Sequence, residues 1–295
     1  MNSGIPLISV LMTVYNKSKF LHQAINSVLS STFEDFELII VDDGSTDDSL
    51  KIVQEFAAID SRIQLHVNDV NLGDYHNRNK AASFAIGKYI KYLDADDVLY
   101  PWTLAVMSRF MERHPNVAYG LDSLDPDIAV PFPLVLDPEQ TYHRHYNIAP
   151  VFHKAPSSCI INREIFWHEG GFSGKRFVGD FEFWMKLSRN YHVLLMPQGM
   201  VWSREHEGQE SKLIWSNSLV VFQYLLAELL ALQHNGCPLP SESRRRLVSR
   251  VRRAMARSAL RSLLIERNLE SFRQKKKGSG LGYLELLFIS LKPYA

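Results

Sequence analysis

The chain has 295 residues, of which 46% are hydrophobic and 22% are charged, a composition typical of ordinary globular proteins. This length allows one large domain, or one domain with a helical extension. The net charge of +1 gives no overall field that would attract nucleic acid, so we expect no nucleic-acid partner. No apolar stretch approaches the roughly 20 residues that span a bilayer.

The first 120 residues alternate between strand-like and helix-like segments. Short apolar runs predict strands, and apolar side chains at helical spacing, such as Leu21, Ala24 and Ile25, predict helices between them. Strands separated in this way are typical of a largely parallel sheet with helices on both faces. The expected strands are residues 7–13, 36–41, 63–67 and 89–93, and the expected helices include 17–31, 50–57, 77–86 and 101–114.

Residues 122–156 break this alternation, because they contain six of the 13 prolines and show little helical period. We interpret this segment as a long excursion over the active-site face, where it can take part in acceptor recognition. Beyond it, the sequence predicts strands at 157–162 and 191–196 and helices at 180–190, 212–234 and 241–266.

The last third of the chain differs in charge from the rest. Residues 241–277 hold 13 Lys or Arg against three Glu. This balance is typical of a solvated helix face, and contact with an anionic membrane surface or another anionic partner is the alternative interpretation. The predicted division is therefore residues 1–211 and a basic, helical extension of residues 212–295.

Three carboxylates follow the fourth expected strand, at Asp94, Asp96 and Asp97. Neighbouring carboxylates repel one another, and a divalent cation removes this cost. Their oxygens are the hard ligands that Mg²⁺ and Mn²⁺ prefer. In extended geometry Asp94 and Asp96 share a face while Ala95 points away, so one can reach a ribose and the other a metal. An acidic loop or a helix cap is the alternative.

Further candidates follow the first two expected strands. The first strand ends at Thr13-Val14-Tyr15-Asn16, and Asp43 follows the second. The carboxyl ends of parallel strands meet at one edge of a sheet. The ring of Tyr15 can stack on a nucleobase, and Asp43 can accept a hydrogen bond from a base N–H. Together with the acids, this pattern indicates a nucleoside diphosphate bound through a metal. A core tyrosine and a turn-forming aspartate are the alternatives.

The helix that starts near Asn77 begins with basic and amide side chains. A helix N-terminus favours anions, so Arg78 or Lys80 can contact a phosphate, although a routine capped helix has the same appearance. The chain has neither the G-x-x-x-x-G-K loop nor a G-x-G-x-x-G after its first strand. ATPase and dinucleotide-binding functions therefore lose their main support.

Two more residues carry candidate chemistry. Sugar transfer with inversion needs a carboxylate that removes the acceptor's hydroxyl proton, and Asp180, at an expected helix start, is our candidate, with Glu182 second. A simple helix cap is the alternative for Asp180. His206 lies in a polar loop after the last expected strand, near Arg204. It can complete a metal shell or contact a diphosphate, whereas a solvent-facing histidine is the alternative.

Several motifs occur in order along the chain. Together they strongly resemble the family 2 glycosyltransferases with the GT-A fold, over roughly residues 5–211, and Met12–Lys17 is similar to the opening of the bacterial spore-coat enzymes of the SpsA type. The resemblance implies a mostly parallel central sheet flanked by helices, followed here by the helical extension. The motifs are Leu11–Asn16, Val41–Asp47, Asn71–Gly73, Arg78–Lys80 and Leu93–Asp97.

The resemblance also implies roles for individual residues. Thr13, Tyr15 and Asp43 would hold the nucleobase, usually uracil, and Asp94 and Asp96 would match the Asp-X-Asp motif. Asp96 is then the expected metal ligand.

For the reaction itself, the resemblance places the catalytic base at Asp180. The family often has Glu-Asp at this point, whereas this chain has Gly179-Asp180. His206 matches a position near the donor diphosphate, where we expect a second metal ligand.

The expected function is inverting, Mg²⁺- or Mn²⁺-dependent transfer of a sugar, from a UDP-sugar or another nucleoside diphosphate sugar, to a glycan or lipid-linked acceptor. Such enzymes generally build cell-surface polysaccharides. We expect a cytoplasmic location, peripheral on the inner face of the membrane, because the sequence shows two cysteines and no recognisable signal peptide. The alternatives are a nucleotidylyltransferase and a non-catalytic protein that binds sugar nucleotides.

Overall fold

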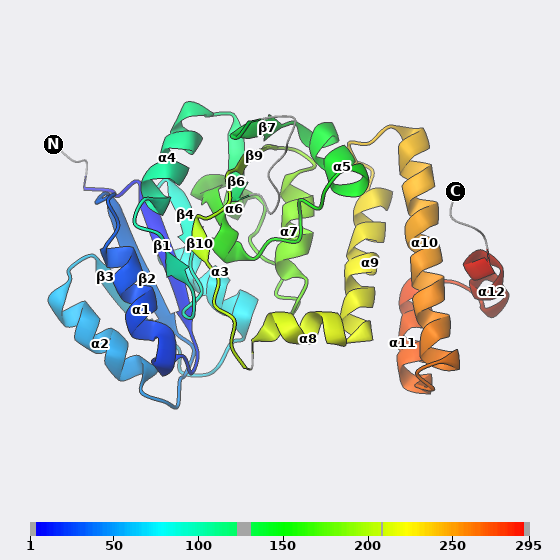
Figure 1. Ribbon diagram of the computed structural model, residues 1–295, viewed down its shortest axis with the longest axis horizontal. Coiled ribbons are helices and arrows are strands. Elements are labelled where there is room, and N and C mark those ends of the chain that lie inside the picture. Colours follow the sequence, from blue (N-terminus) through cyan, green and yellow to red (C-terminus); the bar gives the residue numbers. More distant parts are fainter. Residues whose placement is uncertain (1–3, 123–130, 208, 292–295) are drawn as a thin grey trace. The chain divides into compact units, whose positions relative to one another are not determined.

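An eight-stranded sheet forms the centre of the N-terminal part of the computed structural model, which describes residues 4–122, 131–207 and 209–291 (Figure 1). The strand order is β3-β2-β1-β4-β8-β6-β9-β7, and the first four strands are mutually parallel. The strands are β1 (Ile8–Val14), β2 (Phe36–Asp42), β3 (Ile63–Val67), β4 (Tyr89–Tyr92), β6 (Val117–Asp122), β7 (Leu134–Leu136), β8 (Cys159–Asn162) and β9 (His192–Met196). A two-stranded sheet pairs β5 (Val98–Leu99) with β10 (Val201–Trp202).

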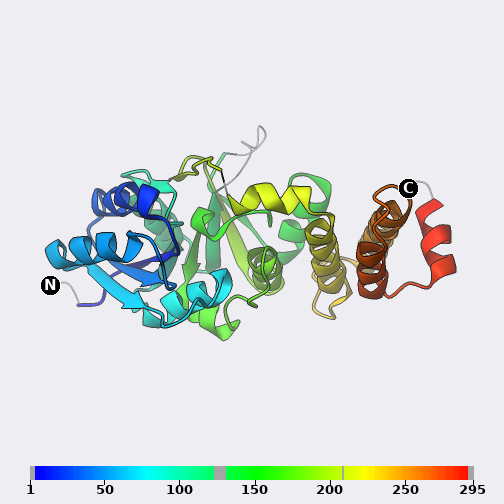
Figure 2. The ribbon, with the colours of Figure 1, turned by 90° about the horizontal axis from the view of Figure 1, so that it is seen from below.

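Helices cover both faces of the parallel part of the sheet. Figure 2 shows α1 and α2 on one face and α3 on the other, as right-handed crossovers require for this strand order. In α1, Leu21, Ala24 and Ile25 are buried in the core that the sheet and helices share, because helical spacing places them on one side. The helices are α1 (Ser18–Leu29), α2 (Ser49–Ile59), α3 (Asp74–Phe84), α4 (Thr103–Arg113), α5 (Pro138–Asn147), α6 (Arg163–His168) and α7 (Gly179–Leu187).

The segment 122–156 differs from the irregular excursion that we expected. Its described residues form β7, at the edge of the sheet, and the three-turn helix α5. Asp137 caps α5 in a capping box with Gln140, and Pro138 occupies the first turn. Because proline is compatible with a first helical turn, the proline content misled the prediction. Residues 123–130 of the predicted excursion lie outside the described part.

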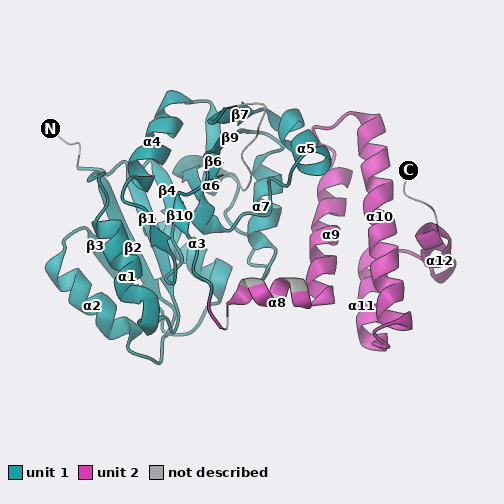
Figure 3. Cartoon of the chain, viewed as in Figure 1, with its two compact units in different colours: residues 1–205 teal, residues 206–295 magenta. Residues whose placement is uncertain are grey.

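The chain divides into two compact units, Met1–Glu205 and His206–Ala295 (Figure 3). The second unit is helical, and its core includes Ala256, Ala259 and Phe272. The helix expected over 212–234 is interrupted, because Asn217 caps a new helix by accepting a hydrogen bond from the Leu219 N–H at 3.0 Å. The helices are α8 (Glu210–Ser216), α9 (Ser218–Gln233), α10 (Ser241–Leu264), α11 (Leu269–Ser279) and α12 (Tyr283–Leu291).

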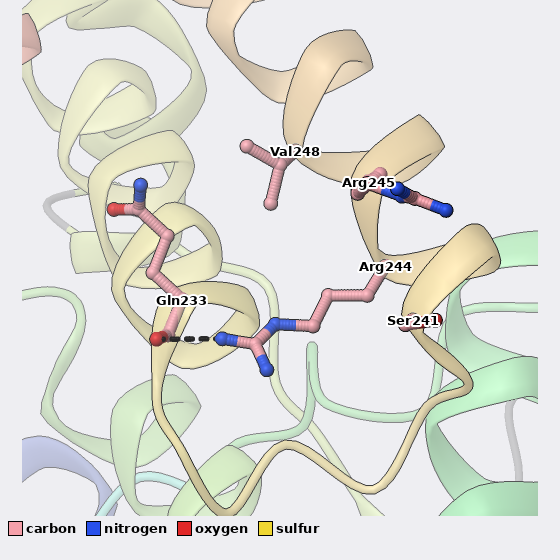
Figure 4. Close-up of a pocket in the computed structure, with 5 residues that line it drawn as sticks. All are labelled: Gln233, Ser241, Arg244, Arg245 and Val248. Carbon is pink, nitrogen blue, oxygen red and sulfur yellow. Dashed lines mark hydrogen bonds between the residues drawn. The ribbon is translucent and has the colours of Figure 1, made fainter.

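A small groove lies between α9 and α10 in the second unit (Figure 4). Arg244 donates hydrogen bonds to the carbonyl oxygens of Leu232 and Gln233, the latter at 2.8 Å. The guanidinium thus satisfies carbonyls at the end of α9, which is a structural role. In the part of the chain that the structure describes, no helix is both long and apolar enough to cross a membrane.

Candidate active site

The strand pair β1 and β4 lies where the direction of the chain connections reverses. From β1 the chain passes through α1 to β2 on one side, whereas α3 leads to β4 on the other side (Figure 1). In open α/β sheets, ligands bind at the carboxyl ends of the strands at such a switch point. Tyr15 follows β1 and Asp94 follows β4, so the fold brings these two predicted residues to one edge.

Arg78 is the centre of the polar cluster at this edge. Its Nε donates to Asp74 and its Nη2 donates to Asp94, both at 2.7 Å. Burial opposes the charge of Arg78, but the two carboxylates outweigh burial and raise the pKa of the guanidinium well above its ordinary value. Its buried Nη1 has no hydrogen-bond partner among the described residues. A buried guanidinium with a free donor is suited to bind a phosphate oxygen.

Asp94 and Asp96 lie in a turn rather than in the extended geometry that we expected. Strand β4 ends at Tyr92, and the Asp97 N–H donates to the Asp94 carbonyl oxygen at 3.0 Å. Ala95 is buried at 2% exposure, and the two carboxylates on either side of it take different partners. Asp94 pairs with Arg78, whereas Asp96 pairs with Lys17. The two acids therefore have different partners in a turn, and the predicted extended geometry was wrong.

The carboxylate of Asp96 faces a cation already. Lys17, which precedes α1, donates its ammonium group to Oδ2 of Asp96, and the Asp96 side chain is 13% exposed. A carboxylate oxygen that faces positive charge fits Mg²⁺ or Mn²⁺, which would compete with Lys17 for this oxygen. His206 is the first residue of the second unit, and its Nδ1 lies 2.7 Å from the Glu207 carbonyl oxygen. Metal binding by Asp96 and His206 stays a prediction.

Asp97 forms a hydrogen bond to the loop that follows β10. The backbone N–H of Arg204 donates to its Oδ1 at 3.0 Å, and Nε of Arg204 donates to the Asp96 carbonyl oxygen at 2.9 Å. Burial, followed by the charge of Asp94, raises the pKa of Asp97 to about 7. Asp97 therefore ties the segment after β10 to the acidic turn, a role that the sequence left open.

The predicted base-binding residues gather at the end of β1. Tyr15 is 48% exposed, so its ring offers a face for stacking, and Thr13 lies half-buried in β1. Asp43 is buried and accepts hydrogen bonds from Nδ2 of Asn68 and from the Leu72 and Gly73 N–H groups, at 2.7, 2.9 and 3.0 Å. Asp43 therefore organises the loop before α3, and its contact with a base stays a prediction.

Asp180 lies at the start of α7, against α3. Its Oδ1 accepts the Phe181 N–H at 2.7 Å, and the ring of Tyr75 lies against the preceding Gly179. Burial raises the pKa of Asp180 to about 7, although the Phe181 N–H and the charge of Arg78 oppose this rise. Such a carboxyl group can exchange a proton near neutral pH. Glu182, the second candidate base, pairs instead with the Lys175 ammonium at 2.6 Å.

Three residues of this cluster were missed in the sequence. The Asp74–Arg78 pair has the i,i+4 spacing of a helical ion pair, so it was readable once the helix was assigned. Lys17 meets Asp96, and the ring of Tyr75 meets Gly179, only through the fold, over separations of about 80 and 100 residues, and no local pattern marks them.

The sheet, its switch point and the acidic turn define the class of protein. The chain has the GT-A fold, with a mostly parallel central sheet, flanking helices and a C-terminal helical region. A family model described as "Glycosyl transferase family 2" matches residues 9–170, more than half of the chain. The chain therefore belongs to glycosyltransferase family 2.

Relatives support this assignment. An uncharacterized glycosyltransferase of Haemophilus influenzae is 25% identical over 218 residues, which cover 70% of this chain and 68% of that protein. Further glycosyltransferase relatives are 38–40% identical over 114–118 residues, and there the match spans less than half of each relative.

Solved structures share the fold at low identity. The Staphylococcus aureus protein TarS (residues 1–349), in complex with UDP-GlcNAc, has a TM-score of 0.70 and 18% identity, covering 92% of this chain and 79% of that one. The mannosyltransferase PcManGT of Pyrobaculum calidifontis, in complex with GDP-Man and Mn²⁺, has a TM-score of 0.60 and 17% identity, covering 94% and 87%.

Proposed function

We propose that this enzyme transfers a sugar, with inversion and with a divalent cation, from a nucleoside diphosphate sugar to a hydroxyl group of a glycan or lipid-linked acceptor. The observation that carries the proposal is the single cluster at the sheet's switch point. There the Nη1 group of Arg78 is a hydrogen-bond donor that could bind a phosphate oxygen. Asp94 and Asp96 are each paired with a cationic side chain, and the pKa of Asp180 is about 7. Binding, leaving-group stabilisation and proton removal each have a residue suited to them.

On the donor side, Tyr15 would stack on the base and Arg78 would bind a phosphate oxygen through Nη1. Asp94, which the Arg78 guanidinium orients, would contact the ribose. Asp96, with His206 as the predicted second ligand, would hold Mg²⁺ or Mn²⁺ in place of its contact with Lys17. When bound, the cation would act as a Lewis acid toward the departing diphosphate.

On the acceptor side, Asp180 would take the proton of the attacking hydroxyl group. The hydroxyl oxygen forms a bond to the anomeric carbon, while the bond from that carbon to the diphosphate oxygen breaks. The electron pair of the broken bond leaves with the diphosphate, and the proton stays on Asp180. Attack from the side opposite the leaving group inverts the anomeric centre.

UDP is the proposed nucleotide, because the family resemblance implies uracil and one structural neighbour was solved with UDP-GlcNAc. The GDP-Man complex of another neighbour makes GDP the main competitor. Synthesis of a cell-surface polysaccharide is the proposed context, consistent with a matched relative whose name includes teichuronic acid biosynthesis. Residues 5–20 lack the Gly-rich, Arg/Lys-containing phosphate loop that a nucleotidylyltransferase normally has near its N-terminus. The raised pKa of Asp180, about 7, argues against a protein that only binds.

The test is a panel of nucleoside diphosphate sugars with Mn²⁺ or Mg²⁺, in which release of the nucleoside diphosphate is measured. Water replaces the acceptor, so slow hydrolysis is expected from the correct donor alone. The proposal is supported if one donor releases nucleoside diphosphate only when metal is present and if Asp96→Ala abolishes that release. The same result identifies the donor sugar. Metal-dependent UDP binding without release from any donor would favour the non-catalytic alternative. Transfer of a nucleotide from a triphosphate would favour the nucleotidylyltransferase.

We also propose that the second unit lies on an anionic membrane surface, on the cytoplasmic side. In α12, the outward side chains Leu284, Leu287, Phe288 and Leu291 are 82%, 50%, 67% and 81% exposed. Their i, i+3, i+4, i+7 spacing forms one apolar stripe, while Leu286 packs inward on the unit's core. The Lys276 ammonium lies 4.3 Å from the ring centre of Tyr283, so positive charge borders the stripe. An apolar face bordered by cations is typical of helices that bind anionic lipid.

Vesicle sedimentation tests this second proposal. The full chain should bind phosphatidylglycerol-containing vesicles and bind poorly to pure phosphatidylcholine, and Leu284→Asp with Phe288→Asp should abolish binding. Retained binding in this double variant would overturn the proposal. A dimer that dissociates in the same variant would show instead that a second copy covers the stripe.

A further inference from the structure

The small sheet of β5 and β10 carries aromatic side chains on its outer face. Across the two strands, Val201 lies opposite Leu99 and Trp202 lies opposite Val98. Leu99 is 2% exposed, and both it and Val201 pack in the hydrophobic core. Because successive side chains of a strand point to opposite faces, Val98 and Trp202 point away from that core. Trp202 is 42% exposed, so the outer face presents an open indole ring.

Two further rings extend this face. Tyr100 directly follows β5 and is the diagonal neighbour of Trp202, a position that an aromatic side chain can reach across a strand pair. Trp102 stacks on Tyr100, with ring centres 5.1 Å apart and ring planes 5° from parallel. Trp102 is still 49% exposed. We call Trp202, Tyr100 and Trp102 the aromatic row.

Contacts with α1 and with the segment that follows it hold the aromatic row in place. The guanidinium of Arg204 lies 4.7 Å from the ring centre of Trp202 and 5.0 Å from that of Phe20, on α1. At the other end of the row, the Pro101 carbonyl oxygen accepts the Thr32 N–H at 2.8 Å, just beyond the end of α1. Rings that are fixed before a ligand arrives lose little conformational entropy on binding, so they are suited to recognition.

The aromatic row begins at the acidic turn of the candidate active site. Val98, which lies opposite Trp202, follows Asp97 directly. Arg204, which contacts the ring of Trp202, also donates from Nε to the Asp96 carbonyl oxygen at 2.9 Å and from its backbone N–H to Asp97 at 3.0 Å. The row is therefore continuous with the turn where we place the metal ion and the departing diphosphate. A substrate that extends away from the reaction centre on this side passes over these rings.

The chemistry of this surface fits a saccharide better than a lipid. One face of a pyranose ring is lined with C–H groups that carry slight positive charge, and the face of an aromatic ring is negative. The hydroxyl groups at the edge of a sugar need polar neighbours. The exposed side chains of Gln23, which is bonded to Arg204, and of Ser203, which follows Trp202, supply them. The outward stripe of α12 is different, since three of its four side chains are leucines, which suit acyl chains.

We infer that the aromatic row is a subsite for the acceptor, in which sugar rings behind the attacking hydroxyl group stack on Trp202 and Trp102. The inference rests on the proposed function and narrows its acceptor to a chain of several sugars, whether free or linked to a lipid. A monosaccharide leaves the row empty and forgoes these contacts. The enzyme should therefore use oligosaccharides in preference to single sugars.

The test measures oligosaccharide binding to the full chain by calorimetry, with chitohexaose, cellohexaose and maltohexaose as probes. At least one hexaose should bind the wild type, and Trp202→Ala and Trp102→Ala should each weaken that binding by about three- to tenfold. Trp202→Phe and Trp102→Phe keep a flat ring and should retain most of the affinity. The matched control is Trp167→Ala, because Trp167 is 38% exposed on α6, packs on Phe166 and lies outside the row. This variant should bind the hexaose as the wild type does.

Several outcomes would overturn the inference. One is that none of the three hexaoses binds the wild type. Another is that both alanine variants bind as tightly as the wild type, or that Trp167→Ala loses as much affinity as they do. Binding to phosphatidylglycerol-containing vesicles that disappears in Trp202→Ala, without any hexaose binding, would make the row a lipid contact instead.

A second readout separates this inference from the proposed function. Hydrolysis of the donor needs no acceptor, so release of nucleoside diphosphate should stay within about twofold of the wild-type rate in Trp202→Ala and Trp102→Ala. A larger loss would place the row in the donor site and contradict the inference. If the wild type hydrolyses no donor yet binds a hexaose through the row, the proposed function fails and the subsite stands. If it hydrolyses a donor but both alanine variants bind hexaoses as the wild type does, this inference alone fails.

Discussion

The carboxylates near α3 differ in what they face. In the turn after β4, Asp94 meets the guanidinium of Arg78 at 2.7 Å, and Asp96 meets the ammonium of Lys17. At the start of α7, Asp180 accepts the Phe181 N–H and lies beside the ring of Tyr75, and burial raises its pKa to about 7. The same side chain is therefore set in two different environments within one site.

This difference supports the two roles proposed above. A carboxylate that is paired with a cation can orient a guanidinium or exchange its partner for a metal ion. A partly buried carboxyl group whose pKa is about 7 can accept a proton near neutral pH. The contrast predicts that substitutions at Arg78, which is paired with Asp94, and at Asp180 damage different steps.

The largest effect is expected from Asp180→Asn. An amide cannot take the proton of the attacking oxygen, so donor hydrolysis should fall by about 100- to 10,000-fold while the affinity for UDP stays within about threefold. Release assays and calorimetric titration with UDP measure the two quantities. Glu182→Gln changes a carboxylate two residues away that pairs with Lys175, and it should keep the wild-type rate. The reverse pattern would make Glu182 the base.

On the donor side, Arg78→Lys should weaken UDP binding by about 10- to 100-fold, because an ammonium cannot bond Asp74, Asp94 and a phosphate in the fork geometry of a guanidinium. Calorimetry checks this, with Arg62→Lys as the control: Arg62 makes a similar pair with Asp60 outside this polar cluster. An unchanged Kd in Arg78→Lys would remove Arg78 from the donor site.

Asp180 should also lower the stability of the folded state at neutral pH and above. Its pKa in the folded protein, about 7, lies above the ordinary value of 3.8 that applies when the chain is unfolded. Between these values the folded state holds a proton that the unfolded state lacks, so stability falls as pH rises from about 4 to 7. Asp180→Asn should therefore be more stable than the wild type by about 1–3 kcal/mol at pH 8, and the difference should vanish near pH 4.

Thermal unfolding at both pH values measures this difference. A variant that is equally stable at pH 8, or that gains the same stability at pH 4, would show that Asp180 ionises as freely in the folded chain as in the unfolded one.

The parallel half of the fold could be predicted because its signals are local. Strands β1 to β4 are continuous apolar runs, and each predicted boundary lies within one residue of the observed one. The strand order then follows from chirality, which also places Tyr15 and Asp94 at one edge. Short elements such as β6 and β7 were missed, because a few residues in a mixed-polarity segment show no period.

The site was predicted as a set of residues but not as a set of pairs. Asp94, Asp96, Arg78 and Asp180 were named from their positions at strand or helix ends, whereas the partner of each depends on the fold. Asp43 illustrates the limit: its carboxylate is bonded to the loop before α3, which no feature near position 43 indicates. Tyr75 illustrates it again, since only the contact with Gly179 reveals its place.

The smallest effect is expected from Lys17→Met, and it tests whether the acidic turn binds metal. Lys17 and a divalent cation would compete for the same oxygen of Asp96, so removing the ammonium should lower the half-saturating Mn²⁺ concentration by about three- to tenfold. Lys19→Met is the matched control, because Lys19 is exposed on α1 and changes the net charge equally. Equal shifts in both variants would reflect net charge alone. A higher Mn²⁺ requirement in Lys17→Met would mean that the Lys17 ammonium assists metal binding rather than competing with the metal for Asp96. That result would reverse the role proposed here for Lys17.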